Sequence, residues 1–229
     1  GKIMAGNLVK CDFDTPVATV TINRPEVLNA YNEELLDQLY QTLEEVFAVD
    51  ETAAVILTSE GNRAFSVGGD IDYLENLDFE QAKNLSIKGQ KLCDLIEKST
   101  PVVIAAVDGY ALGGGMEITL ACDLRLASTR SRFGQPEVKL GIIPAFGGTQ
   151  RLPRLIGEAE AKELLYTGDI IDATLAYELG LINKVVTPRS LISEAKELAI
   201  EITDRSIKAV KLIKTAVNKR CLDASKAGY

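Results

Sequence analysis

The stretch ALGGGMEITLACD, residues 111–123, places three consecutive glycines directly before a methionine and a glutamate in an otherwise apolar segment. Glycine is costly to hold in a helix or strand because it loses the most conformational freedom, and a carboxylate is costly to bury. Two interpretations compete. The stretch is either a tight turn leading into a buried helix with Glu117 facing solvent, or a backbone anion site with a catalytic carboxylate beside it.

The overall composition indicates a folded, soluble chain. Its 229 residues are 46% hydrophobic, which supports a sizeable core, but no apolar run reaches the roughly 20 residues that span a bilayer. Residues 1–10 contain no signal-peptide apolar block, so we expect a cytoplasmic protein without membrane contact. A net charge of −8 disfavours nucleic-acid binding. The four scattered cysteines argue against a zinc ribbon or a disulfide framework.

The chain contains no histidine. Ser-His-Asp and Cys-His nucleophile systems and His-ligated metal sites are therefore excluded within this chain, and we expect no metal. Acid–base chemistry near neutral pH must come from carboxylates, lysine, tyrosine or cysteine with shifted pKa values. The sequence also lacks a GxxxxGK[ST] phosphate loop and a GxGxxG fingerprint, which removes the main support for kinase-like and dinucleotide-binding functions.

Apolar periodicity predicts strands that alternate with helices. The predicted strands are a hairpin within 8–25 and runs at 53–59, 101–109 and 123–129, and the predicted helices are 33–47, about 80–98, 159–168, 173–180, 191–204 and about 206–220. Residues 131–157 are expected to form a long, loop-rich passage. The pattern indicates an α/β fold with a parallel or mixed sheet and a helical C-terminal region.

Two glycine-rich passages could point backbone N–H groups at a ligand. AFSVGGD (64–70) turns just after an apolar strand, and GYALGGGME (109–117) opens a helix whose first N–H groups lack intrahelical partners. If both passages face the same point, their N–H groups would supply two hydrogen-bond donors to a developing oxyanion. In acyl chemistry one such donor contributes roughly 3 to 4 kcal/mol of barrier lowering.

A third passage, FGQPEVKLG (133–141), places Glu137 in a turn after Pro136. Taken alone, each of the three passages has an ordinary explanation, because a Pro-Glu pair commonly begins a solvated helix and a glutamate in a first helical turn is stabilised by the helix dipole. The residues themselves therefore support only a hypothesis: carboxylates and backbone donors acting together without metal or histidine.

Four longer passages, taken in order, resemble the signature sequences of the crotonase superfamily, specifically the enoyl-CoA hydratases. They are NRPEVLNA (23–30), AFSVGGDI (64–71), GYALGGGMEITLACDLRLAS (109–128) and FGQPEVKLGIIPAFGGTQRLPRLIG (133–157). The resemblance implies a spiral of ββα units over residues 1–190 and a helical oligomerisation region over 191–229. It also implies an acyl-CoA substrate, no cofactor beyond that substrate, and a homotrimer or a dimer of trimers.

The resemblance also assigns roles to individual residues. The backbone N–H groups of Gly69 and Gly114 would form an oxyanion hole for the thioester carbonyl oxygen. Glu117 and Glu137 would share one water: Glu117 takes its proton as hydroxide adds to the β-carbon, and Glu137 delivers a proton to the α-carbon. Gln135 would orient Glu117 through a hydrogen bond.

Coenzyme A contacts follow from the same resemblance. The residues implied are Leu28, Ala64, Ser66, Gly68, Asp70 and Ile71. Asp70 has an equal alternative as a helix N-cap. Asp72 stands where many relatives carry lysine, so one contact to the nucleotide is expected to be missing. Ala145 stands where many hydratases have glycine, and its methyl group would narrow the pocket while its amide still orients a water.

The C-terminal end is also expected to differ from the family. The chain ends at KAGY, where relatives usually continue through a further helix, so we expect a shortened C-terminal region.

The expected reaction is reversible syn hydration of a trans-2-enoyl-CoA to a 3-hydroxyacyl-CoA, in fatty-acid or short-chain acyl-CoA metabolism. One alternative is an enoyl-CoA isomerase, which uses one dominant carboxylate and adds no water. Another is a non-catalytic RNA-binding protein of the same fold. A basic stripe supports the RNA-binding alternative, but the net charge favours a solvated helix face instead. The stripe consists of Lys208, Lys211, Lys214, Lys219 and Arg220.

Overall fold

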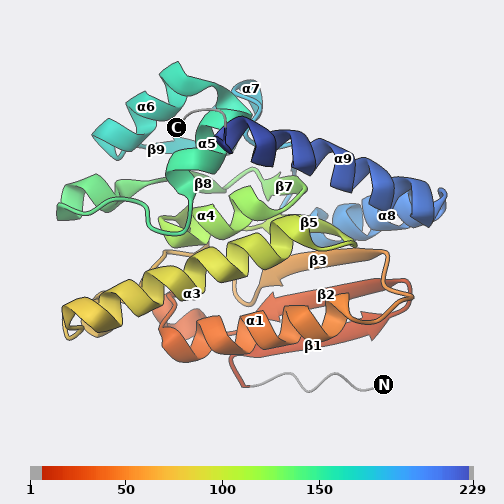
Figure 1. The fold of residues 1–229 in the computed structure, drawn as a ribbon, viewed down its shortest axis with the longest axis horizontal. Helices are drawn as coiled ribbons and strands as arrows, with labels where there is room; N and C mark the ends of the chain where they lie inside the picture. Colours follow the sequence, from red (N-terminus) through yellow and green to blue (C-terminus); the bar gives the residue numbers. More distant parts are fainter. Residues whose placement is uncertain (1–6, 227–229) are drawn as a thin grey trace.

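The structure, a computed structural model, describes residues 7–226 and the side chains of residues 7–219 (Figure 1). Its strands are β1 (Val9–Asp14), β2 (Val17–Ile22), β3 (Ala54–Ser59), β4 (Ala64–Ser66), β5 (Val102–Val107), β6 (Tyr110–Leu112), β7 (Leu124–Ser128), β8 (Arg132–Gly134), β9 (Ile170–Asp172) and β10 (Lys184–Val186).

The α-helices are α1 (Glu33–Phe47), α2 (Ile71–Leu74), α3 (Phe79–Lys98), α4 (Gly114–Ala121), α5 (Gly148–Ile156), α6 (Glu158–Thr167), α7 (Ala173–Glu178), α8 (Leu191–Thr203) and α9 (Ile207–Lys226). Two 3-10 helices, η1 (Pro25–Val27) and η2 (Pro136–Leu140), lie between them. Over residues 7–226, no helix combines the length and the apolar character that crossing a membrane requires.

The strands form two sheets that the chain visits in turn. The larger sheet has six strands in the order β1-β2-β3-β5-β7-β10, parallel except at the β1 hairpin, and the smaller has four in the order β4-β6-β8-β9. Each of β3, β5 and β7 is followed by a short strand of the smaller sheet and then by helical structure. This repetition stacks similar units, so the connections after β4, β6 and β8 gather on one side.

The central strands of the larger sheet are buried on both faces. Along β3 and β5, alternate side chains enter two separate apolar clusters, one shared with α1, α3 and α4 and the other with α8. Strands covered on both faces are expected to be apolar throughout rather than alternating. That is why 53–59 and 101–109 appear in the sequence as continuous hydrophobic runs.

Most predicted elements are confirmed, whereas residues 131–157 are more regular than expected. Helix α1 has the predicted bounds, and its N-terminus is capped by Asn32, whose side chain accepts from the Leu35 N–H. The passage expected to be loop-rich contains β8, η2 and α5. Helix α5 escaped prediction because it begins after Gly147 without a side-chain cap and contains Pro153.

Helix α9 turns one member of the basic stripe, Lys214, toward the core, while Lys208 and Lys219 are exposed. Lys214 is buried, and its Nζ lies 2.7 Å from Asp123 Oδ2 and donates to Pro101 O at 2.8 Å. Ile213 and Val217, apolar residues of the same helix, are about 60% exposed. A lysine can be buried when a carboxylate and carbonyl oxygens surround its ammonium group, so the solvated-face interpretation is wrong for this residue.

Candidate active site

A cavity of about 930 Å³ lies where the connections after β4, β6 and β8 meet. Its lining includes Gly68 and Gly69 from the first glycine loop, Gly114 and Glu117 from the start of α4, and Glu137 from η2. The five positions span nearly 70 residues of sequence, yet they share one apolar cavity. The structure thus brings together the three passages that the sequence singled out.

The first glycine loop packs directly against the start of α4. Gly68 has φ = +92°, and a Cβ added there would lie 3.0 Å from Leu112 O and 3.5 Å from Gly114 N. A side chain at Gly68 would therefore be strained by its backbone angle and crowded by the second loop. Glycine at this position allows the two backbones to approach each other.

Within residues 7–226 the N–H groups of Gly69 and Gly114 have no backbone acceptor outside regular elements, and the Gly114 N–H points at the Tyr31 hydroxyl oxygen. Gly114 is the first residue of α4, so its N–H has no intrahelical partner. Gly69 lies between β4 and α2, and within residues 7–226 its N–H donates none of the backbone bonds outside regular elements. Both residues line the cavity, which is the arrangement expected of paired backbone donors for an oxyanion.

Glu117 is almost completely buried, with an exposed fraction of 1%. Its Oε1 accepts from the Phe146 N–H at 2.9 Å and from the Gly148 N–H at 2.6 Å. Burial raises the pKa of Glu117 to about 7, although both N–H groups and the charge of Arg151 act in the opposite direction. Of the two interpretations of the glycine stretch, a solvent-facing Glu117 is therefore excluded.

Glu137 is the second buried carboxyl group of the cavity, and it lies over Gly113: a Cβ added to that glycine would be 3.1 Å from Glu137 Oε1. Burial, together with the charge of Glu117, raises the pKa of Glu137 to about 7, although a backbone hydrogen bond acts in the opposite direction. Each carboxyl group can therefore donate or accept a proton near neutral pH, and the two influence each other.

Gln135 contacts a different glutamate from the one expected. With its amide oriented so that both ends have partners, its nitrogen donates to Glu137 Oε1 at 3.1 Å and to Oε2 at 3.2 Å. No hydrogen bond joins Gln135 to Glu117 among the side chains described. The expected bond to Glu117 is wrong because Gln135 directly precedes η2, whereas Glu117 is held by the loop before α5.

The expected coenzyme A contacts divide into two groups. Gly68, Asp70 and Ile71 line the cavity, as do Asp72 and Ala145, where the chain departs from the family pattern. The other three expected contacts lie outside the cavity lining: Leu28, Ala64 and Ser66.

Asp70 is the N-cap of α2, as its alternative interpretation predicts. Its side chain accepts from the Tyr73 N–H at 3.4 Å, and its Oδ2 pairs with Arg24 Nη1 at 2.7 Å. The backbone of Ala64, in turn, is already engaged, because its carbonyl oxygen accepts from Asn29 Nδ2 at 2.8 Å.

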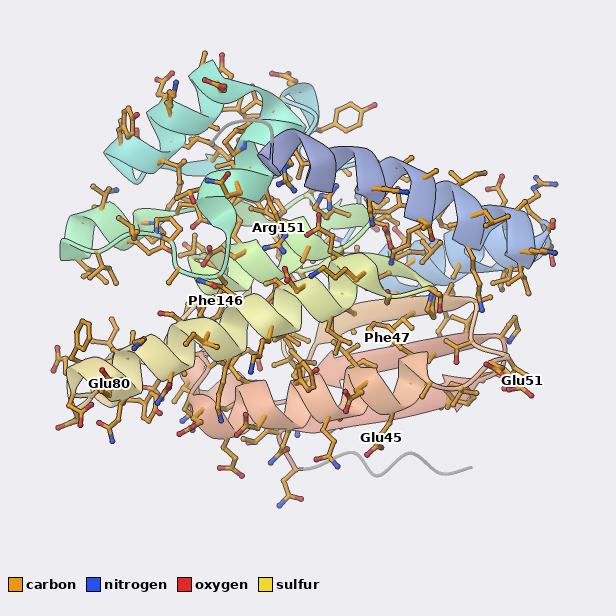
Figure 2. The ribbon with its side chains drawn as sticks, in the orientation of Figure 1. Glu45, Phe47, Glu51, Glu80, Phe146 and Arg151 are labelled. Atoms are coloured by element: carbon orange, nitrogen blue, oxygen red, sulfur yellow. The ribbon has the colours of Figure 1, made fainter. Side chains whose placement is uncertain are left out.

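Arg151, on α5, supports the site by holding the loop that binds Glu117. It was not identified from the sequence. Its Nη1 donates to Phe146 O at 2.8 Å, and its Nη2 lies 2.9 Å from Asp94 Oδ1 and 2.8 Å from Glu97 Oε2 (Figure 2). Arg151 thereby ties the loop that holds Glu117 to helix α3. No sequence signal indicates this role, because its two carboxylate partners on α3 lie more than 50 residues away.

The chain is similar to known proteins over most of its length. Residues 12–228 match the family model described as enoyl-CoA hydratase/isomerase. The chain is 45% identical over 219 residues to crotonyl-CoA hydratase of Syntrophomonas wolfei, covering 94% of this chain and 83% of that protein. It is 46% identical over 213 residues to short-chain-enoyl-CoA hydratase of Clostridium acetobutylicum, covering 93% and 82%.

A solved structure shares the fold as well as the sequence pattern. The enoyl-CoA hydratase of Bacillus anthracis superimposes with a TM-score of 0.90 at 36% identity, covering 96% of this chain and 88% of that one. The crotonase fold expected from the signature passages is thus confirmed. With its sequence matched over nearly its whole length and its glycine loops and glutamates gathered at one cavity, the chain belongs to the enoyl-CoA hydratase/isomerase family.

Proposed function

We propose that this protein is an enoyl-CoA hydratase that adds water reversibly to a trans-2-enoyl-CoA and forms a 3-hydroxyacyl-CoA. The observation that carries this proposal is the pairing of two buried carboxyl groups, each with a pKa raised to about 7, in one cavity with two backbone donors. Hydration needs one group to take a proton and one to give a proton, and this cavity provides both.

The backbone donors address the main barrier of the reaction. Adding hydroxide to the β-carbon pushes negative charge onto the thioester oxygen, so the N–H groups of Gly69 and Gly114 would stabilise the enolate as it forms. Glu117 takes a proton from the attacking water, whose oxygen bonds to the β-carbon. Glu137 gives a proton to the α-carbon, and the enolate electrons return to form that C–H bond.

The two carboxyl groups also favour hydration over the alternatives. Isomerisation needs one dominant carboxylate, whereas Glu117 and Glu137 are both buried and both have a raised pKa. RNA binding loses support because Lys214, a member of the basic stripe, is buried against Asp123 and cannot contact a phosphate backbone.

The direct test is to mix the purified protein with crotonyl-CoA and follow the ultraviolet absorbance of the conjugated thioester. We expect the absorbance to fall as 3-hydroxybutyryl-CoA appears in the mass spectrum. The variant Glu117→Gln/Glu137→Gln is the matched control, because it keeps the shape of the site and loses both proton carriers. The assignment is overturned if wild type lowers the absorbance no faster than this variant. It is also overturned if wild type shows no turnover and only binds RNA in a salt-sensitive manner.

We also propose that the chain assembles as a homotrimer or a dimer of trimers. Leu212, Ile213 and Val217 form an apolar surface on α9, each about 60% exposed, which a neighbouring subunit would cover. Sedimentation equilibrium should therefore report three or six chain masses. A species of one chain mass at micromolar concentration would contradict the assembly.

A further inference from the structure

Tyr31 lies at the junction of the two glycine loops. Its backbone holds the first loop: the Tyr31 N–H donates to Gly68 O at 2.9 Å, and the Tyr31 carbonyl oxygen accepts from the Asp70 N–H at 3.0 Å. Its side chain reaches the second loop, where a Cβ added to Gly114 would overlap the Tyr31 hydroxyl oxygen. One residue therefore fixes the first candidate donor through its backbone and contacts the second through its hydroxyl group.

The ring of Tyr31 is held firmly in this position. Only 6% of the residue is exposed, and its ring packs on that of Phe146 with centroids 5.1 Å apart and planes tilted by 34°. Phe146 is itself wedged against α3, because a Cβ added to Gly89 would overlap its ring, and its carbonyl oxygen is held by Arg151 (Figure 2). The hydroxyl group of Tyr31 is thus placed by the packing of its ring on Phe146.

The hydroxyl proton is available to a bound ligand. Tyr31 lines the cavity, and among the side-chain hydrogen bonds of the described residues none uses its hydroxyl as a donor. Burial raises the pKa of Tyr31 well above its usual range, and the charges of Glu117 and Glu137 raise it further. The phenol is therefore protonated near neutral pH and remains a hydrogen-bond donor.

We propose that the Tyr31 hydroxyl group donates a third hydrogen bond to the thioester carbonyl oxygen, beside the N–H groups of Gly69 and Gly114. The Gly114 N–H points at the Tyr31 hydroxyl oxygen, so an oxygen bound by that N–H would lie next to the phenol, whose proton no acceptor takes among the described side chains. This inference rests on the proposed hydratase function, since it concerns the same oxyanion. A side-chain donor would then supplement two backbone donors in stabilising the enolate.

The first test is the variant Tyr31→Phe, which removes the hydroxyl group and keeps the ring that packs on Phe146. We expect kcat/KM for crotonyl-CoA to fall by about 10- to 100-fold, while the thermal midpoint changes little. Tyr40→Phe makes the same chemical change on α1, outside the cavity lining, and should leave kcat/KM unchanged. If wild type hydrates crotonyl-CoA and Tyr31→Phe has the same kcat/KM, the inference is overturned. If wild type does not hydrate crotonyl-CoA, the hydratase assignment is overturned instead.

The second test reads the hydrogen bond itself. Butyryl-CoA labelled with carbon-13 at the carbonyl cannot be hydrated, so its C=O stretch can be recorded while bound to wild type and to Tyr31→Phe. A third donor lowers this frequency, and we expect the lowering on binding to be smaller in the variant. A rate loss without any change in the carbonyl frequency would show that the hydroxyl group acts on another atom, and would reject the proposed bond.

Discussion

Glu137→Gln should lower kcat for hydration of crotonyl-CoA by about 10²- to 10⁴-fold, and Glu117→Gln by a similar factor, because each removes one proton carrier from the transition state. Glutamine keeps the size of the side chain. At position 117 its amide oxygen can still accept from the Phe146 and Gly148 N–H groups that hold the wild-type carboxylate. Absorbance assays with crotonyl-CoA measure kcat for both variants.

Proton exchange separates the two roles. In D₂O, butyryl-CoA can lose and regain an α-proton through Glu137 and the backbone donors without any water being added. We expect Glu117→Gln to retain this exchange and Glu137→Gln to lose it, as followed by the α-proton signal in NMR. Glu80→Gln, an exposed change at the start of α3, is the control and should match wild type (Figure 2). Exchange that survives in Glu137→Gln but not in Glu117→Gln would reverse the assignment.

Lys214→Met should lower the free energy of unfolding by about 3 to 5 kcal/mol, the cost of breaking a buried ion pair by removing one partner. Lys214 has an exposed fraction of 7% and its Nζ also donates to Ser99 Oγ at 2.8 Å and Pro101 O at 2.8 Å. The variant removes the ammonium group from the Asp123 carboxylate, which then keeps only the Val103 N–H as a hydrogen-bond donor among the described residues. Denaturant unfolding followed by circular dichroism measures the loss.

Two further variants make this stability prediction specific. Lys208→Met changes an exposed lysine on the same helix and should stay within about 0.5 kcal/mol of wild type. Asp123→Asn/Lys214→Met should lose less stability than the two single changes added together, because the second change removes the charge stranded by the first. Equal losses in Lys208→Met and Lys214→Met would show that the ion pair does not anchor α9.

Local structure was predictable wherever a short stretch contains its own signal. Helix α1 has leucines at helical spacing after an Asn32 cap, and β3 is a short apolar run ended by a turn, so each was found from its own residues. Helix α5 carries no such signal: it starts after a glycine and includes Pro153. Its stability comes instead from contacts such as those that Arg151 makes with α3.

Side-chain partners were less predictable than elements. Gln135 and Glu137 are only two positions apart, but the direction of each side chain depends on how η2 meets the start of α4, and the expected bond to Glu117 was wrong. Lys214 likewise belongs to a basic helix face in the sequence, and only Asp123, about 90 residues earlier, explains its burial.

By itself, the sequence determined the class of chemistry. It has no histidine, so proton transfer near neutral pH falls to other groups, and the resemblance of its glycine and glutamate passages to crotonase signatures implied the fold and the roles of Gly69, Gly114, Glu117 and Glu137. The tertiary structure alone decided that both carboxyl groups are buried with a pKa near 7, and that Tyr31 joins the two loops. The physical reason is that burial and close contact depend on segments far apart in the chain, which no local pattern of residues records.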